Sequence, residues 1–151
     1  MIPVEDLKQQ HREICEMMKV LTILVQDETV RGTGTVFGLF QQLADKVHEH
    51  FALEERTLYR ELLTYPDDQV RATAQRFLSG SYQVKKFFAD YLHNWCHPEA
   101  SQESCEAFLK QTDDVFTLLK QRMRVEDESF YTLAQDLQAA DTDEAGAAAR
   151  H

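Results

Sequence analysis

A histidine and a glutamate occupy positions where the helical pattern of the sequence predicts buried apolar residues. Between Val36 and Leu58 the apolar residues recur at steps of three and four, as they do along the buried face of an amphipathic helix. His50 and Glu54 fall on this face four residues apart, so their side chains point in the same direction. Because an unpaired carboxylate is costly to bury, the pair should meet a metal, a cation or a hydrogen-bond network on neighbouring helices.

Similar interruptions occur on the apolar faces of three other predicted helices. The first helix has His11 on its face, the third has Ser81, and the fourth has Arg122 and Glu126, again four residues apart. Counted at about 1.5 Å per residue from the predicted helix ends, these positions fall at a similar height near one end of the core. We therefore predict one buried polar layer, made of His11, His50, Glu54, Ser81, Arg122 and Glu126.

Helix-breaking residues in the sequence predict where the four helices that carry this layer begin and end. The helices are predicted to run from Val4 to about Gln26, from Val36 (with Thr35 as a cap) to Leu63, from Asp67 or Asp68 to His97, and from Ser101 to about Leu137. Long helices with short connections predict an all-α fold, an antiparallel up-down-up-down four-helix bundle over residues 1–138. Residues 139–151 lack an apolar face, and we predict a disordered tail.

Composition excludes several classes of function. A formal net charge of -10 opposes binding to nucleic acid, whose phosphates such a surface would repel. No stretch has the roughly 18 apolar residues of a membrane span, and the first residues lack a basic, apolar leader, so we expect no membrane partner. The three cysteines form no CxxC pair, which favours a reducing compartment and the cytoplasm.

Three segments resemble the hemerythrin-like (HHE cation-binding) family. They read H-R-E-I at residues 11–14, H-F-A-L-E-E-R-T-L-Y at 50–59 and R-M-R-V-E-D-E-S-F-Y at 122–131. In its layout of helices, the resemblance covers nearly the whole chain apart from the tail. It implies a four-helix bundle that holds two bridged irons, with roles in binding oxygen, sensing oxygen or iron, or handling iron and nitric oxide.

By motif position, the resemblance assigns four metal ligands and two lost ones. It implies that His11 and His50 are histidine ligands and that Glu54 and Glu126 are the bridging carboxylates. Where the family has two further histidines, this chain has Ser81, within S-Y-Q-V at 81–84, and Arg122. Both losses affect the same iron, so we expect a degenerate member with at most one non-haem metal ion, iron in preference, or none.

Three functions follow from this incomplete site. The first is a metal-binding sensor or carrier. The second is a metal-free regulatory bundle, in which the permanently charged guanidinium of Arg122 replaces the lost metal and balances the glutamates. The third is an oxidoreductase with one iron, which would need an open coordination position and a substrate pocket. We expect a protein that is not an enzyme, with an unidentified protein partner or none, as a monomer or homodimer.

Other residues that could bind metals have simpler explanations. Tyr82 follows Ser81 and is an alternative ligand, as a phenolate. His93 and His97 are four residues apart but lie off the apolar face, at a predicted helix end far from the polar layer. We expect this pair to be solvated, His48 to lie on the surface, and Cys15 to be buried or half-buried.

Overall fold

The structure, a computed structural model, describes residues 1–95 and 105–149, and these residues are almost entirely helical. The elements are α1 (Val4–Leu24), α2 (Glu28–Arg31), α3 (Gly34–Glu54), η1 (Glu55–Tyr59), α4 (Arg60–Leu62), α5 (Asp68–Trp95), α6 (Cys105–Val125), η3 (Glu126–Phe130) and α7 (Tyr131–Ala149). No strand occurs in the two described ranges. The all-α prediction is therefore confirmed.

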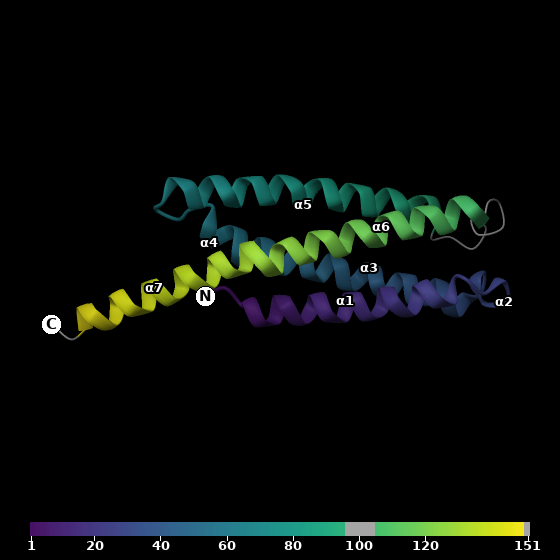
Figure 1. Cartoon of the computed structure of the whole chain (residues 1–151), viewed down its shortest axis with the longest axis horizontal. Coiled ribbons are helices and arrows are strands. Elements are labelled where there is room, and N and C mark those ends of the chain that lie inside the picture. Colours follow the sequence, from purple (N-terminus) through teal and green to yellow (C-terminus); the bar gives the residue numbers. More distant parts are fainter. Residues whose placement is uncertain (96–104, 150–151) are drawn as a thin grey trace.

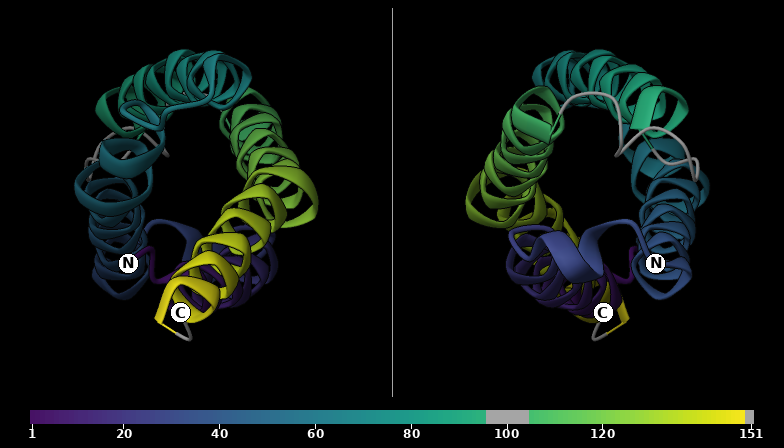
Figure 2. Two further views of the ribbon diagram at one scale, coloured as in Figure 1. Left: turned by 90° about the vertical axis from the view of Figure 1, so that its left-hand side faces the viewer. Right: turned by 90° about the vertical axis from the view of Figure 1, so that its right-hand side faces the viewer.

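Four long helical rods form an antiparallel bundle (Figure 1). The first rod is α1, and the second runs from α3 through η1 to α4. The third rod is α5, and the fourth runs from α6 through η3 to α7. Viewed from either end, each rod lies beside the rods that precede and follow it in the chain, and α6 and α7 close the ring against α1 (Figure 2). This is the up-down-up-down topology predicted from the sequence.

The caps of the helices follow local side-chain chemistry. Asp67 caps α5, since its Oδ1 accepts hydrogen bonds from the backbone N–H groups of Gln69 and Val70. Thr33, rather than Thr35, caps α3, because Thr33 has the extended backbone of a capping residue and its hydroxyl accepts from Val36 N. The helix expected to begin at Val36 thus begins at Gly34. Residues 96–104, which include His97, Ser101 and Cys96, lie outside the described residues.

Two of the rods each contain a π-helical turn at or directly after a buried glutamate. The turn η1 comes directly after Glu54, and η3 begins at Glu126. A π-turn bonds residue i to residue i+5 and so adds one residue to the turn of an α-helix. As a result, two consecutive residues are buried at the end of each turn: Leu58 and Tyr59 in η1, and Phe130 in η3 with Tyr131 directly after it. The strict alternation of three and four predicts only the first residue of each pair.

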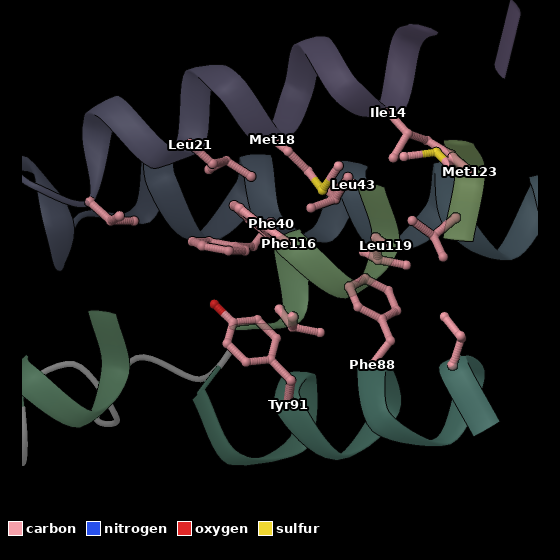
Figure 3. Packing of buried hydrophobic residues seen from close by; sticks show 14 of the residues in the cluster. Ile14, Met18, Leu21, Phe40, Leu43, Phe88, Tyr91, Phe116, Leu119 and Met123 are labelled. Carbon is pink, nitrogen blue, oxygen red and sulfur yellow. The ribbon is translucent and has the colours of Figure 1, made fainter. Parts of the chain in front are cut away.

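The apolar core consists of two clusters on either side of the predicted polar layer. The larger cluster contains Ile14, Met18, Leu43, Phe88 and Leu119 among others (Figure 3). The smaller one includes Leu7, Leu58, Tyr59, Ala74, Phe130 and Tyr131. On every rod, the polar positions fall between residues of the first cluster and residues of the second. The polar layer thus crosses the core as a single section.

The C-terminal segment differs from its prediction as a disordered tail. The helix α7 continues to Ala149 and extends past the other rods (Figure 1). Alanine, which makes up six of the eleven residues 139–149, favours a helix even without an apolar face. Gln138 and Asp141 also hold the start of this segment, through contacts with Ile2 and Tyr65. None of the helices in the described ranges is long and apolar enough to cross a membrane.

Candidate metal centre

The polar layer contains five almost completely buried polar residues. The residues exposed by 3% or less are His11, His50, Glu54, Ser81 and Glu126. The side chain of Arg122 is slightly more accessible, at 13%. The layer thus combines imidazoles and carboxylates from three of the rods with a serine from α5, in a place that excludes most solvent.

The two histidines face each other with the same ring nitrogen. Nε2 of His11 lies 2.9 Å from Nε2 of His50, and the ring centroids are 4.4 Å apart. The first imidazole comes from α1 and the second from α3, two helices that pack along their length. This contact brings together residues 39 positions apart in the sequence.

The outer nitrogens of both rings are hydrogen-bonded to oxygen acceptors. Nδ1 of His11 donates to Oδ1 of Asp127 at 2.9 Å, and Nδ1 of His50 donates to Oε1 of Gln10 at 2.8 Å. In a neutral imidazole with its proton on Nδ1, the other nitrogen carries a lone pair. The two Nε2 lone pairs therefore meet at 2.9 Å, an arrangement that needs a cation or a proton between them.

Two carboxylates complete the set of donors around these nitrogens. Oε1 of Glu126 lies 3.2 Å from Nε2 of His11 and 3.9 Å from Nε2 of His50. Oε1 of Glu54 lies 3.3 Å from Nε2 of His50. Neither of these oxygens has a hydrogen bond of good geometry among the described residues. Donor atoms of His11, His50 and Glu126 all lie within 4.8 Å of one another, so one ion could contact all three residues.

Tyr131 adds a hydroxyl to the same place. It donates a hydrogen bond to Oε2 of Glu54 at 2.9 Å, and its oxygen lies 3.1 Å from Nε2 of His11 and 3.5 Å from Nε2 of His50. Its ring stacks on that of His11, with centroids 5.2 Å apart. Burial and the nearby Glu126 and Glu54 raise the pKa of the phenol, which favours the neutral donor form.

The other half of the layer is occupied by Arg122. Its Nη2 donates to the carbonyl oxygen of Phe77 at 2.7 Å and to the hydroxyl of Tyr59 at 3.0 Å. Its Nε lies 3.5 Å from Oε2 of Glu126. A Cβ atom on Gly80 would lie 2.8 Å from Nη1, so the absence of a side chain at this residue leaves room for the guanidinium.

These contacts differ in part from the predicted position of Arg122. The sequence places it beside Glu126 and facing Glu54. Within the described residues, its polar contacts run to Glu126, Tyr59 and Phe77, and none to Glu54. The reason is that the guanidinium turns towards α5, where the Phe77 carbonyl accepts from it. Ser81 Oγ and Arg122 Nε remain without a hydrogen-bond partner among the described residues.

The crowding of charges shifts the pKa values of this layer. Burial by itself lowers the pKa of His50, but Glu126 and Glu54 outweigh this effect and raise it to about 9. Burial raises the pKa of Glu54, and the negative charge of Glu126 raises it further. Burial opposes ionisation of Glu126 too, but the neighbouring groups of Glu54, His11 and His50 and the charge of Arg122 lower its pKa. The layer thus favours one ionised carboxylate and a cation beside it.

The alternative ligands from the sequence lie away from this place. Tyr82 is 55% exposed, and the Nζ of Lys85 lies over its ring, so it does not join the polar layer. His93 and His48 are exposed, while His97 lies outside the described residues. Cys15 and Cys105 are free thiols of intermediate exposure.

Sequence reasoning missed four residues of the layer's surroundings. Gln10 and Asp127 are part-exposed polar residues, and their positions carry no periodic signal. Tyr59 and Tyr131 did leave a signal, because each follows its glutamate by five residues, as E-E-R-T-L-Y at 54–59 and E-D-E-S-F-Y at 126–131. The repeated spacing indicates the two π-turns.

The donor set could hold a metal ion. Two imidazole nitrogens and two carboxylates form the mixed nitrogen and oxygen set that suits iron or manganese. The oxygens of Glu54 and Glu126 that lack hydrogen-bond partners among the described residues, together with the facing nitrogens, are available to contact an ion. Within the described part of the chain, the half that holds Ser81 and Arg122 offers no imidazole of its own, and the guanidinium cannot ligate a metal and keeps its charge.

Comparison with known families agrees with this geometry. The family model described as Hemerythrin HHE cation binding domain matches residues 2–134, which include every residue of the polar layer. Searches of curated proteins and of solved structures found no match.

Proposed function

This chain belongs to the hemerythrin HHE cation-binding family, and on that premise we propose that it binds one non-haem metal ion, iron in preference. The ligands in this proposal are His11, His50, Glu54 and Glu126. The proposed role is a metal-related or oxygen-related sensor or carrier with an incomplete di-iron site.

The observation that carries this proposal is the contact between the two Nε2 atoms. Both Nδ1 atoms donate to acceptors, and the remaining nitrogens face each other at 2.9 Å. Hydrogen bonds of this kind fix the tautomer and direction of metal-binding histidines. Asp127 and Gln10 thus prepare both rings to present lone pairs to one cation.

The protein's own groups define what the site can do. His11 and His50 supply neutral donors, and Glu126 supplies negative charge. Glu54 supplies Oε1, while its Oε2 accepts a hydrogen bond from Tyr131. An iron bound there would supply a redox-active Lewis acid. Because the four ligands are 3% exposed or less, the site is better suited to retaining an ion or admitting a very small molecule than to converting a larger substrate.

The test is a measurement of metal content and affinity. Protein purified without chelator is analysed for metals and then titrated with Fe²⁺ under anaerobic conditions. We expect about one ion per chain, and His50→Ala should abolish binding because one of four ligands is lost. His48→Ala is the matched control, since this histidine lies on the same helix and is exposed. Two ions per chain would contradict the incomplete site.

A second candidate function is a metal-free regulatory bundle. It is favoured by the ion pair between Arg122 and Glu126 and by the raised pKa of His50. Arg122 and one protonated histidine together would balance two glutamates without a metal. In that case wild-type protein would bind no Fe²⁺ in the titration, and a protein partner would be the functional ligand. For either function, we propose a cytoplasmic monomer or homodimer that binds neither nucleic acid nor membranes.

A further inference from the structure

The hydroxyl of Tyr131 contacts more of the proposed donor set than any described group outside it. It lies within 3.5 Å of atoms of His11, His50 and Glu54, which come from two different helices. The tyrosine is fully buried, with an exposure of 0%. Nothing in its own apolar cluster requires a hydroxyl, because phenylalanine would fill nearly the same volume there.

The π-turn η3 explains how Tyr131 reaches this position. In a regular α-helix, a residue five positions after another points about 140° away from it. A π-turn bonds residue i to residue i+5 and brings the two to the same face. Glu126 and Tyr131 span η3, and both are buried in the core. The turn thus directs a carboxylate and a phenol from one helix into the same half of the layer.

The chain contains a natural counterpart of this arrangement. Glu54 and Tyr59 span η1 with the same spacing, but the hydroxyl of Tyr59 accepts a hydrogen bond from Arg122. Each tyrosine therefore hydrogen-bonds to a side chain of the other rod that contains a π-turn. Tyr131 contacts the half of the layer with two histidines, and Tyr59 contacts the half with the guanidinium.

We propose that Tyr131 is a positioning residue for metal binding, which acts by holding Glu54. This inference rests on the proposed function. Because Oε2 of Glu54 accepts the phenol hydrogen at 2.9 Å, the carboxylate is fixed with Oε1 towards Nε2 of His50. That oxygen has no other hydrogen-bond partner among the described residues, so it is kept for a cation. A carboxylate set in its binding orientation loses less conformational freedom when the ion arrives.

The test compares Tyr131→Phe with Tyr59→Phe. Each variant removes one buried hydroxyl next to a π-turn, but only the first removes the hydrogen bond to Glu54. Affinities for Fe²⁺ and for Co²⁺ are measured anaerobically by competition with a chelator. We expect Tyr131→Phe to weaken both by about 10- to 100-fold, the usual effect of losing a partner of a metal ligand. Tyr59→Phe should change them less than about threefold, because its partner Arg122 is not a ligand.

A double-variant cycle tests whether Tyr131 acts through Glu54. In a Glu54→Ala background, no side-chain oxygen remains at residue 54 for Tyr131 to hold, so adding Tyr131→Phe should weaken the remaining Co²⁺ binding by His11, His50 and Glu126 little further. The visible absorption of bound Co²⁺ gives a second readout, since it responds to ligand arrangement. It should change in Tyr131→Phe and remain unchanged in Tyr59→Phe.

Several results would overturn the inference. Unchanged affinity in Tyr131→Phe, equal losses in both tyrosine variants, or additive losses in the cycle would each do so. A phenolate absorption band in the Fe³⁺ wild type that disappears in Tyr131→Phe would show direct ligation instead of positioning. A wild-type protein that binds neither Fe²⁺ nor Co²⁺ would overturn the proposed function, and this inference with it.

Discussion

Arg122 distinguishes the two halves of the polar layer at the scale of single residues. A guanidinium stays charged at any usable pH and offers five donor N–H groups, so it can only pair with acceptors. Here its partners are Glu126, the Tyr59 hydroxyl and the Phe77 carbonyl. The residue therefore supplies the positive charge of its half without being able to hold a metal.

Replacing Arg122 by methionine should destabilise the metal-free protein by about 3 to 5 kcal/mol, because Glu126 would remain buried without its cation. Arg124→Met is a close control, since Arg124 pairs with Glu128 at the same spacing but is 76% exposed. Exposed pairs contribute little, so this control should lose less than about 1 kcal/mol. Urea unfolding of both chelator-treated variants measures the difference. A loss below about 1 kcal/mol in Arg122→Met would rule out charge replacement by the guanidinium.

At the scale of the elements, the sequence predicted regular geometry well and irregular geometry poorly. Steps of three and four located the buried faces of all four rods, including polar positions such as His11 and Ser81, because an α-helix repeats every 3.6 residues. A π-turn breaks this repeat, so Tyr59 and Tyr131 were missed. Asp127 was missed for a different reason, since only the packing of α1 against the fourth rod brings it to a histidine.

The helices α5 and α6 should accept two histidines at the positions of Ser81 and Arg122. Arg122→His removes the guanidinium beside Gly80, and Ser81→His then places an imidazole where a small buried side chain lies now. Since Glu54 and Glu126 already face the layer, the double variant should bind about two irons per chain and gain near-ultraviolet absorption on oxidation. Either single variant should not, because each leaves the second ion short of a ligand.

Overpacking around Ser81 is the main physical obstacle, at a cost of about 1 to 3 kcal/mol. Circular dichroism and thermal unfolding therefore accompany the metal analysis. A folded double variant that takes up no more iron than the wild type would contradict the assignment of Ser81 as a vacated ligand position.

Across the whole molecule, the polar layer separates two apolar clusters and joins all four rods. The layer has few alternatives to its present arrangement, because groups as buried as Glu54 and Glu126 are costly without partners. The sequence could place this layer by counting residues along each predicted helix. It could not determine which atoms meet there, since the facing nitrogens of His11 and His50 depend on how α1 and α3 are rotated about their axes.

The stability of the metal-free protein should fall as pH rises from about 6.5 to about 9. The pKa of His50 is raised in the folded state from 6.5 to about 9, so its protonated form stabilises the fold at low pH, and this contribution disappears through about pH 9. The rise corresponds to on the order of 3 kcal/mol. The raised pKa of Glu54 acts in the same direction, because the folded state loses stability as this buried carboxyl ionises.

Iron affinity should change in the opposite direction and rise with pH, because binding displaces protons from the ligands. Denaturant unfolding at several pH values, with chelator and with excess Fe²⁺ under anaerobic conditions, tests both trends. The exposed residue His48 gives a control, since His48→Gln replaces a histidine of the same helix that lies outside the polar layer. A metal-free protein that gains stability between pH 6.5 and 9 would contradict the pKa direction given for His50.

The paired π-turns also affect how the backbone reports on the layer. Within η1 and η3 the amide hydrogens belong to widened turns, which lack the regular bonding of the flanking helices and should exchange with deuterated solvent sooner. Glu54 immediately precedes one turn and Glu126 begins the other. An ion bound by both carboxylates would therefore link these two segments of weaker backbone hydrogen bonding. Amide protection in residues 55–59 and 126–130 should then increase more on metal loading than protection in the middle of α5. Hydrogen–deuterium exchange of these two short segments would thus measure how fully the site is occupied, without any chromophore.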